Sequence, residues 1–157
     1  MKLKLIVLVL PLMLTGCIFV PVPVGPGTGP GPVATTNCGG QPVTVDASSP
    51  SFVVVGDCPK VSVEGNGLVV TIGDVQSLQL NGDRLTVTAD KTGNLSIGGN
   101  DNSVTTDSLG GVTINGDRNT LTTGTVFGVT IGGNDNTIHG SVTGEVVQGG
   151  DRNAVGD

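Results

Sequence analysis

The sequence predicts an all-β protein, a parallel β-solenoid (β-helix) of about six 17-residue coils preceded by an irregular, disulfide-clamped N-terminal coil. Apolar and polar residues alternate throughout the second half of the chain, which is typical of strands with one face inward. The core must be slim, because the chain has three Phe and neither Tyr nor Trp. The strongest observation is a row of glycines spaced 17 residues apart: Gly65, Gly82, Gly99, Gly116, Gly133 and Gly150.

The expected inward positions of each coil hold β-branched residues or Leu. Five residues after the glycines the chain reads Val70, Val87, Val104, Leu121, Ile138 and Val155. Four residues before them it reads Val61, Leu78, Leu95, Val112, Val129 and Val146. Neighbouring coils should pair as parallel strands about 4.8 Å apart, so six coils make a rod on the order of 30 Å long.

The glycine row needs a backbone explanation. A tight corner is expected to require φ > 0, a conformation that glycine adopts without steric cost. Gly116→Val should therefore disrupt the coil more than a surface substitution.

A row of asparagines lies three residues after the glycines. Its members are Leu68, Leu85, Asn102, Asn119, Asn136 and Asn153. Leucine in two coils indicates that this position points inward, so the four asparagines should stack as an internal ladder in which each amide donates to the next. We interpret this ladder as structural, because no catalytic partner lies beside it in the sequence.

The position two residues after the glycines alternates in charge. It reads Gly67, Arg84, Asp101, Arg118, Asp135 and Arg152, which makes the full repeat 34 residues long. Alternation replaces repulsion between stacked like charges with a line of ion pairs. Its expected use is to set the register, because a slip of one coil would bring like charges together.

Asp and Asn beside paired glycines also suggest a calcium-binding solenoid. Here the carboxylates to consider are Asp83, Asp117 and Asp151. The 17-residue period and the Arg in alternate coils differ from calcium-binding nonapeptide repeats. The alternative is that Asp and Asn stabilise the turns through their own side chains.

The N-terminus has the features of a lipoprotein signal peptide. Lys2 and Lys4 precede an apolar run over residues 5–14, which is short for a membrane span. The following Leu14-Thr15-Gly16-Cys17 resembles a bacterial lipobox. That resemblance implies cleavage after residue 16 and attachment of diacylglycerol, with a further acyl chain such as palmitate, to Cys17. We expect a protein anchored in the bacterial cell envelope, at the outer membrane if the host has one and otherwise on the outer face of the cytoplasmic membrane.

Three segments follow from these features. Residues 1–16 form the signal peptide, residues 17–36 a lipidated tether, and residues 37–157 the solenoid domain. The tether is rich in Pro and Gly and has no periodic apolar face, so it should be semi-extended.

Cys38 and Cys58 are expected to form a disulfide, because they are the even pair that remains after Cys17 in an exported protein. Closing a loop of this length stabilises by roughly 3 kcal/mol. The alternative, a metal site of two Cys with His139, is disfavoured by the distance of His139 along the chain.

The chain from Asn37 onward resembles the bacterial domain of unknown function 3060 family. The resemblance rests on Asn37-Cys38-Gly39-Gly40, Gly56-Asp57-Cys58, VSVEGNG and the repeated G-[DN]-[RD]-N-x-[VLI] units. Leu68 and Leu85 depart from the usual Asn. The resemblance implies an exported, often lipidated protein with this type of fold, and no activity.

Charge and composition exclude several classes of function. Without Lys2 and Lys4 the mature chain has five basic and 13 acidic residues, a net charge of −8. Nucleic acid and anionic lipid surfaces are poor partners for such a chain. The chain has one histidine, His139, and no Ser/His/Asp grouping at a defensible spacing, so we expect no enzyme activity, cofactor or metal.

The remaining expectation is a binding module for an envelope protein or glycan, or a structural spacer. An ice-binding solenoid is a further alternative, because outward positions form T-x-T pairs. The outward pairs are Val69/Thr71, Thr86/Thr88, Ser103/Thr105, Thr120/Thr122 and Thr137/His139, of which two are Thr-x-Thr. Exposed Thr is also explained by its strand propensity. The last coil is unfinished at Asp157, so the protein is expected to be a monomer or an edge-paired dimer.

Overall fold

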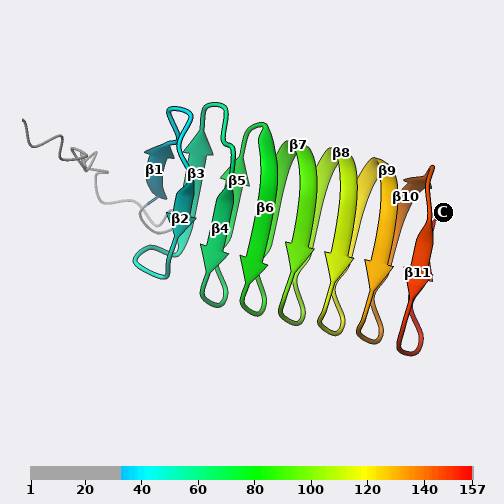
Figure 1. Cartoon of the computed structure of the whole chain (residues 1–157). Helices are drawn as coiled ribbons and strands as arrows, with labels where there is room; N and C mark the ends of the chain where they lie inside the picture. The colour runs from blue at the N-terminus through cyan, green and yellow to red at the C-terminus, as the bar shows by residue number, and fades with distance from the viewer. Residues whose placement is uncertain (1–32, 157) are drawn as a thin grey trace, which may run out of the picture.

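The computed structural model of the chain describes residues 33–156, which wind into a rod of strands and turns (Figure 1). The predicted signal peptide, the lipid site at Cys17 and the tether as far as residue 32 lie outside the described residues. No helix long and apolar enough to cross a membrane occurs in the described part of the chain.

Twelve strands form one continuous parallel sheet over the described residues. They are β1 (Val33–Asn37), β2 (Val43–Val45), β3 (Ser51–Val55), β4 (Val61–Glu64), β5 (Val69–Ile72), β6 (Val75–Asn81), β7 (Thr86–Ile97), β8 (Ser103–Ile114), β9 (Thr120–Ile131), β10 (Thr137–Val142), β11 (Val146–Gln148) and β12 (Ala154–Val155). The predicted all-β solenoid is therefore confirmed.

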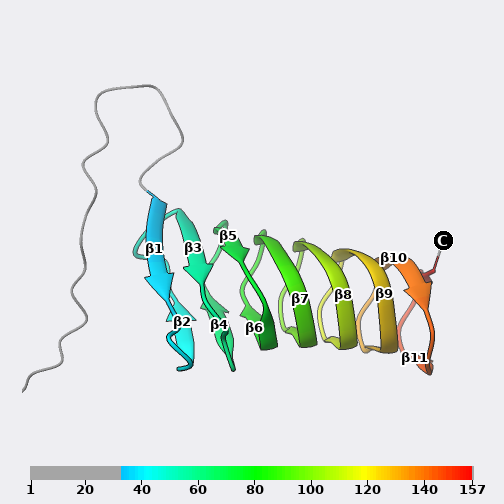
Figure 2. The same cartoon turned by 90° about the horizontal axis from the view of Figure 1, so that it is seen from above.

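The sheet wraps around a flat core, so it presents two outer faces (Figures 1 and 2). The layer made by one set of strands is called the first face. It consists of β1, β3, β5, the first halves of β7–β9, β10 and β12. The second face is made by β2, β4, β6, the second halves of β7–β9 and β11. Each residue of β8 pairs with the residue 17 positions later in β9, as in Thr105 with Thr122.

The predicted inward rows fill the core between the two faces in every coil but the last, where Val146 is 40% exposed and Val155 is half-buried. Val70, Val87 and Val104 are each 1% exposed, and Leu121 and Ile138 are fully buried. Each such aliphatic side chain stabilises the fold by about 1.5–3 kcal/mol on burial. Phe52, in the irregular N-terminal coil, is the one aromatic residue of the described core.

The expectation that the glycine row needs φ > 0 is wrong for its four middle members. The left-handed conformation is instead taken two residues later, at Arg84, Asp101, Arg118, Asp135 and Arg152, with φ of 56–58°. Glycine is needed because consecutive coils touch here. A Cβ added at Gly99 or Gly116 would lie 1.9 Å from the carbonyl oxygen of the glycine one coil earlier. Close approach, and not a special φ, therefore explains this row.

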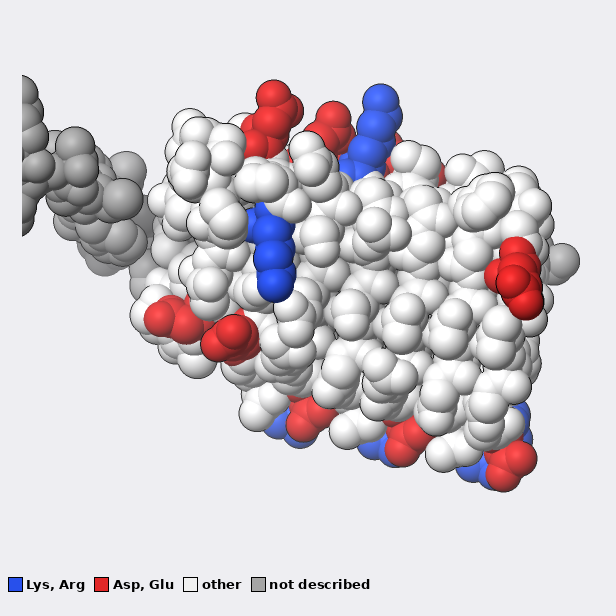
Figure 3. Space-filling view, viewed as in Figure 1, with Lys and Arg blue, Asp and Glu red and all other residues white. Residues whose placement is uncertain are grey.

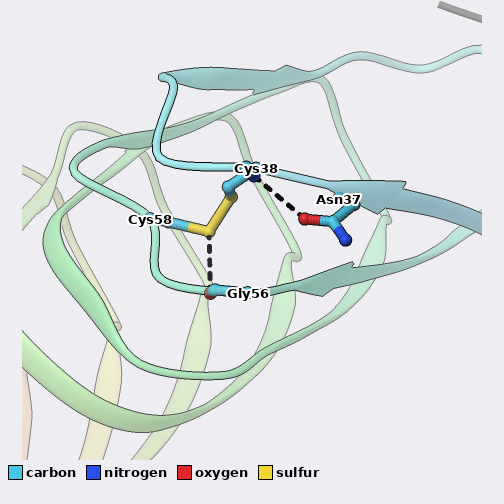
Figure 4. Close-up of a disulfide and its surroundings, with 5 residues drawn as sticks. Asn37, Cys38, Gly56 and Cys58 are labelled. Carbon is cyan, nitrogen blue, oxygen red and sulfur yellow. Dashed lines mark hydrogen bonds between the residues drawn. A yellow bond between two sulfur atoms is a disulfide. The ribbon is translucent and has the colours of Figure 1, made fainter.

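The N-terminal coil is closed by the predicted disulfide. Cys38 and Cys58 are bonded, with their Cα atoms 5.4 Å apart (Figure 4). Both cysteines are buried, and the Asn37 side chain accepts a hydrogen bond from the Gly39 amide at 2.9 Å beside them. The first strand begins at Val33 and pairs with β3, four residues before the expected domain boundary. The reason is that Ala34 packs into the core.

Candidate functional site

The asparagine row forms a ladder inside the turn edge, where each coil passes from the second face to the first. Asn102, Asn119 and Asn136 are at most 1% exposed, and Asn153 is half-buried. The Asn119 side-chain oxygen accepts a hydrogen bond from the backbone N–H of Asn102 at 3.0 Å. Its side chain nitrogen donates to Gly99 O at 2.9 Å and to the Asn136 side chain oxygen at 3.1 Å. The side-chain amides of this ladder are hydrogen-bonded to the neighbouring coils, so the ladder has a structural role.

A second ladder stands beside the first, and the sequence analysis missed it. It is formed by the row one residue after the glycines: Asn66, Asp83, Asn100, Asp117, Asn134 and Asp151. Asp83 accepts hydrogen bonds from the backbone and side chain nitrogens of Asn100, at 2.8 and 3.2 Å. Asp117 does the same for Asn134, at 2.7 and 3.2 Å. The strict Asn/Asp alternation was the signal that could have revealed it.

Two of the calcium candidates, Asp83 and Asp117, thus accept hydrogen bonds from backbone amides of the next coil. The Asp83 and Asp117 carboxylates each use one oxygen for the next coil, and the Asp151 amide donates to Asn134 at 2.9 Å. Within residues 33–156 no group of three or more His, Cys, Asp or Glu side chains could hold a metal ion. The observed contacts join residues 17 apart in successive coils, and so differ from the bonds within a single turn that the alternative expected.

The charged row makes two bidentate ion pairs on the outer side of the turn edge, which Figure 3 shows as adjacent acidic and basic side chains along the lower rim. Arg118 donates from Nε and one terminal nitrogen to the two oxygens of Asp101, both at 2.7 Å. Arg152 makes the same pair with Asp135. The hydrogen bond from Arg118 lowers the pKa of Asp101 below its ordinary value, and the hydrogen bond from Arg152 does the same to Asp135.

The first face presents the T-x-T residues in two parallel rows. Thr71, Thr88, Thr105 and Thr122 pair in register across four coils and are all exposed. His139 continues this row, opposite Thr122. The Thr members of this row present hydroxyl and methyl groups to the outside.

The second face is hollowed into a shallow open groove of about 590 Å³ that runs across β6, β7, β8, β9 and β11. Figure 3 views this face, and the part over β6–β9 shows neither acidic nor basic side chains. Ser96, Thr113 and Thr130 line the groove at equivalent positions of successive coils. Glu145 and the 69% exposed Phe127 line its C-terminal end.

Two glycines on this groove are not explained by the fold. Gly111 and Gly128 pair with each other inside β8 and β9, and neither has a positive φ. A Cβ at Gly111 would come no nearer than 3.4 Å to Asn94, and one at Gly128 no nearer than 3.9 Å to Glu145. Sequence reasoning missed this groove. The available signals were glycines in strand interiors outside the 17-residue row and a lone outward aromatic residue.

No family model, curated protein or solved structure matches the chain. The relation to the domain of unknown function 3060 family therefore stays a prediction from the motifs.

Proposed function

We propose that this protein is a cell-envelope lipoprotein whose β-solenoid is a non-catalytic binding module, held at the membrane by a lipid on Cys17. The lipobox-like Leu14–Cys17 and the Pro/Gly-rich tether support the address. The buried Cys38–Cys58 disulfide supports it as well, because structural disulfides persist in oxidising compartments outside the cytoplasm.

One observation carries the binding role. The groove on the second face combines a charge-free middle with an exposed aromatic ring, Phe127, on a rod whose turn edge is rigidly cross-bonded. Exposed large aromatic residues on hollowed surfaces are typical of recognition sites. The Asp83 and Asp117 carboxylates and the Asn119 side-chain amide of the turn edge are bonded within the scaffold, whereas the groove residues Ser96, Thr113 and Phe127 face the open groove.

Photo-crosslinking in cells tests the binding role. A photoreactive amino acid at Ser96 or Thr113 is placed on the second face, and one at Thr88 or Thr105 on the first face serves as the matched control. We expect a reproducible adduct from the second face alone. Absence of an adduct from both faces would overturn the binding role in favour of a spacer.

Globomycin, which blocks the lipoprotein signal peptidase, tests the proposed lipid anchoring at the membrane. The precursor should accumulate uncut, and radiolabelled palmitate should be lost in a Cys17→Ser variant. Normal processing with a free Cys17 thiol would overturn the lipoprotein proposal.

Ice binding is a second candidate, and the register of the first face favours it. Thr88, Thr105 and Thr122 repeat at one coil spacing beside a parallel row of Thr and Ser. If this face binds ice, the wild type shows thermal hysteresis and Thr122→Leu abolishes it. No hysteresis in the wild type ends this candidate.

Edge pairing into a dimer remains an expectation that sedimentation can test.

A further inference from the structure

We infer that the groove on the second face binds an extended β-linked glycan, uncharged or bearing amino groups, that lies along the rod axis with one sugar ring over each coil. This inference rests on the proposed binding function and names its ligand class and contact residues. Three features of the groove carry it: its depth, the spacing of its hydroxyl groups, and its charge.

The depth of the groove comes from Gly111 and Gly128. Glycine inside a strand costs stability, and it is kept where a ligand or another backbone approaches closely. No neighbouring backbone needs these two positions, since an added Cβ would meet only ordinary contacts of 3.4 and 3.9 Å. A side chain at either position would therefore fill the groove. The neighbouring Gly110 differs, because its Cβ would lie 2.3 Å from the Gly93 carbonyl oxygen.

The hydroxyl row sets a repeat for the ligand. Ser96, Thr113 and Thr130 pair in register, so one hydroxyl group recurs per coil, about 4.8 Å apart. A sugar ring in an extended β-linked chain advances by a similar distance. It also presents hydroxyl or acetamido groups that exchange hydrogen bonds with such a row. A peptide strand rises about 3.4 Å per residue, so its residues do not match the spacing of about 4.8 Å between coils.

The C-terminal end of the groove indicates which side of a sugar ring contacts the protein and which charge the ligand carries. The exposed ring of Phe127 offers an apolar surface for the C–H face of a sugar, and Glu145 beside it offers a carboxylate. A carboxylate near an aromatic ring also favours an ammonium group. No Lys or Arg lines the groove, and the mature chain has a net charge of −8. Anionic polymers are therefore disfavoured, whereas neutral and amino sugars are compatible.

Titration calorimetry on the full-length chain tests the inference, in a detergent without a sugar head group. The probes are cellohexaose and the hexamers of N-acetylglucosamine and glucosamine, with β-1,4-linked oligoglucuronate as the anionic control. We expect at least one neutral or amino hexamer to bind and oligoglucuronate not to bind. Gly128→Thr should weaken binding at least tenfold without lowering the melting temperature, because Thr is a better strand residue than Gly. Phe127→Ala should also weaken it at least tenfold, and Thr105→Val on the first face should leave it unchanged.

The outcomes separate the ligand class from the binding function. Failure of all three uncharged or amino hexamers to bind overturns the glycan inference, as does equal affinity of Gly128→Thr and the wild type. If photo-crosslinking from Ser96 then captures a protein, the proposed binding function stands and its ligand is a protein. If neither experiment finds a ligand, the proposed binding function fails together with the inference.

Discussion

The turn edge and the second face of the rod both contain glycines in register, yet these glycines have different surroundings. At the turn edge, a Cβ on Gly116 would lie 1.9 Å from the Gly99 carbonyl oxygen. On the second face, the nearest atom to a Cβ on Gly128 would be 3.9 Å away. The polar side chains differ in the same way. Asn119 is buried and bonded to the coils on both sides, whereas Thr130 is exposed beside the groove.

This difference separates residues that build the rod from residues that the rod displays. A repeated residue whose neighbours occupy all the space around it is explained by folding alone. A repeated glycine with free space on a hollowed face is not, because a larger residue would fit there and stabilise the strand. We therefore place the scaffold at the turn edge and the binding role on the second face.

The largest expected effect comes from adding one methyl group at each kind of glycine. Gly116→Ala forces the Cβ into a backbone carbonyl group, so we expect a loss of about 4 kcal/mol or more. Gly111→Ala on the second face should instead raise stability by about 0.4–1 kcal/mol, because it restricts the unfolded chain. Denaturant unfolding followed by far-ultraviolet dichroism measures both. Equal losses in the two variants would remove the distinction between the two regions.

The asparagine ladder provides the next effect. Asn119→Ala leaves a cavity and removes the partners of the Asn102 amide and the Gly99 carbonyl group, which should cost about 3 kcal/mol. Asn119→Leu should cost less, because Leu68 and Leu85 occupy the same inward position in earlier coils and leave no cavity.

Thr113→Ala on the second face is the matched control for the ladder variants, and it should change stability by no more than about 0.5 kcal/mol. Chemical unfolding ranks the variants. A larger loss for Asn119→Leu than for Asn119→Ala would mean that hydrogen bonding, and not filled volume, dominates this row.

The ion pairs of the turn edge should have the smallest effect, because they are exposed. The pKa values of Asp101 and Asp135 are lowered in the folded state, so their stabilisation is complete above the unfolded value of about 3.9. It is lost as the pH falls through the lower folded values. Arg118→Gln should therefore lower the melting temperature slightly at pH 7, and the difference from wild type should vanish in strong acid. A difference that grows as the pH falls would contradict this assignment.

The sequence was sufficient to predict the architecture of the rod because each inward position recurs every 17 residues. Val87, Val104 and Leu121 all lie in the core, and the Cys38–Cys58 disulfide was predicted from cysteine count and compartment. The reason for the glycine row was not predicted. Periodicity along the chain shows that a residue is required, but only the contact between Gly99 and Gly116 shows that the requirement is space.

The groove was not predicted for a related reason. Ser96, Thr113 and Thr130 lie at ordinary outward strand positions, and nothing in their spacing distinguishes a hollowed face from a flat one. The hollow depends on which glycines lie against a backbone atom of the previous coil and which have room for a Cβ. That information lies in the distances between coils, as the contrast between Gly110 and Gly111 shows.

The most direct test of the central claim combines crosslinking with stability in one variant. The Gly111→Thr, Gly128→Thr double substitution fills the groove, and a photoreactive residue at Ser96 reports what the groove contacts in cells. We predict that the adduct seen with the otherwise wild-type chain disappears, while the melting temperature of the double variant is equal to or higher than that of the wild type. An undiminished adduct from a fully folded double variant would contradict the assignment of the second face as the binding surface.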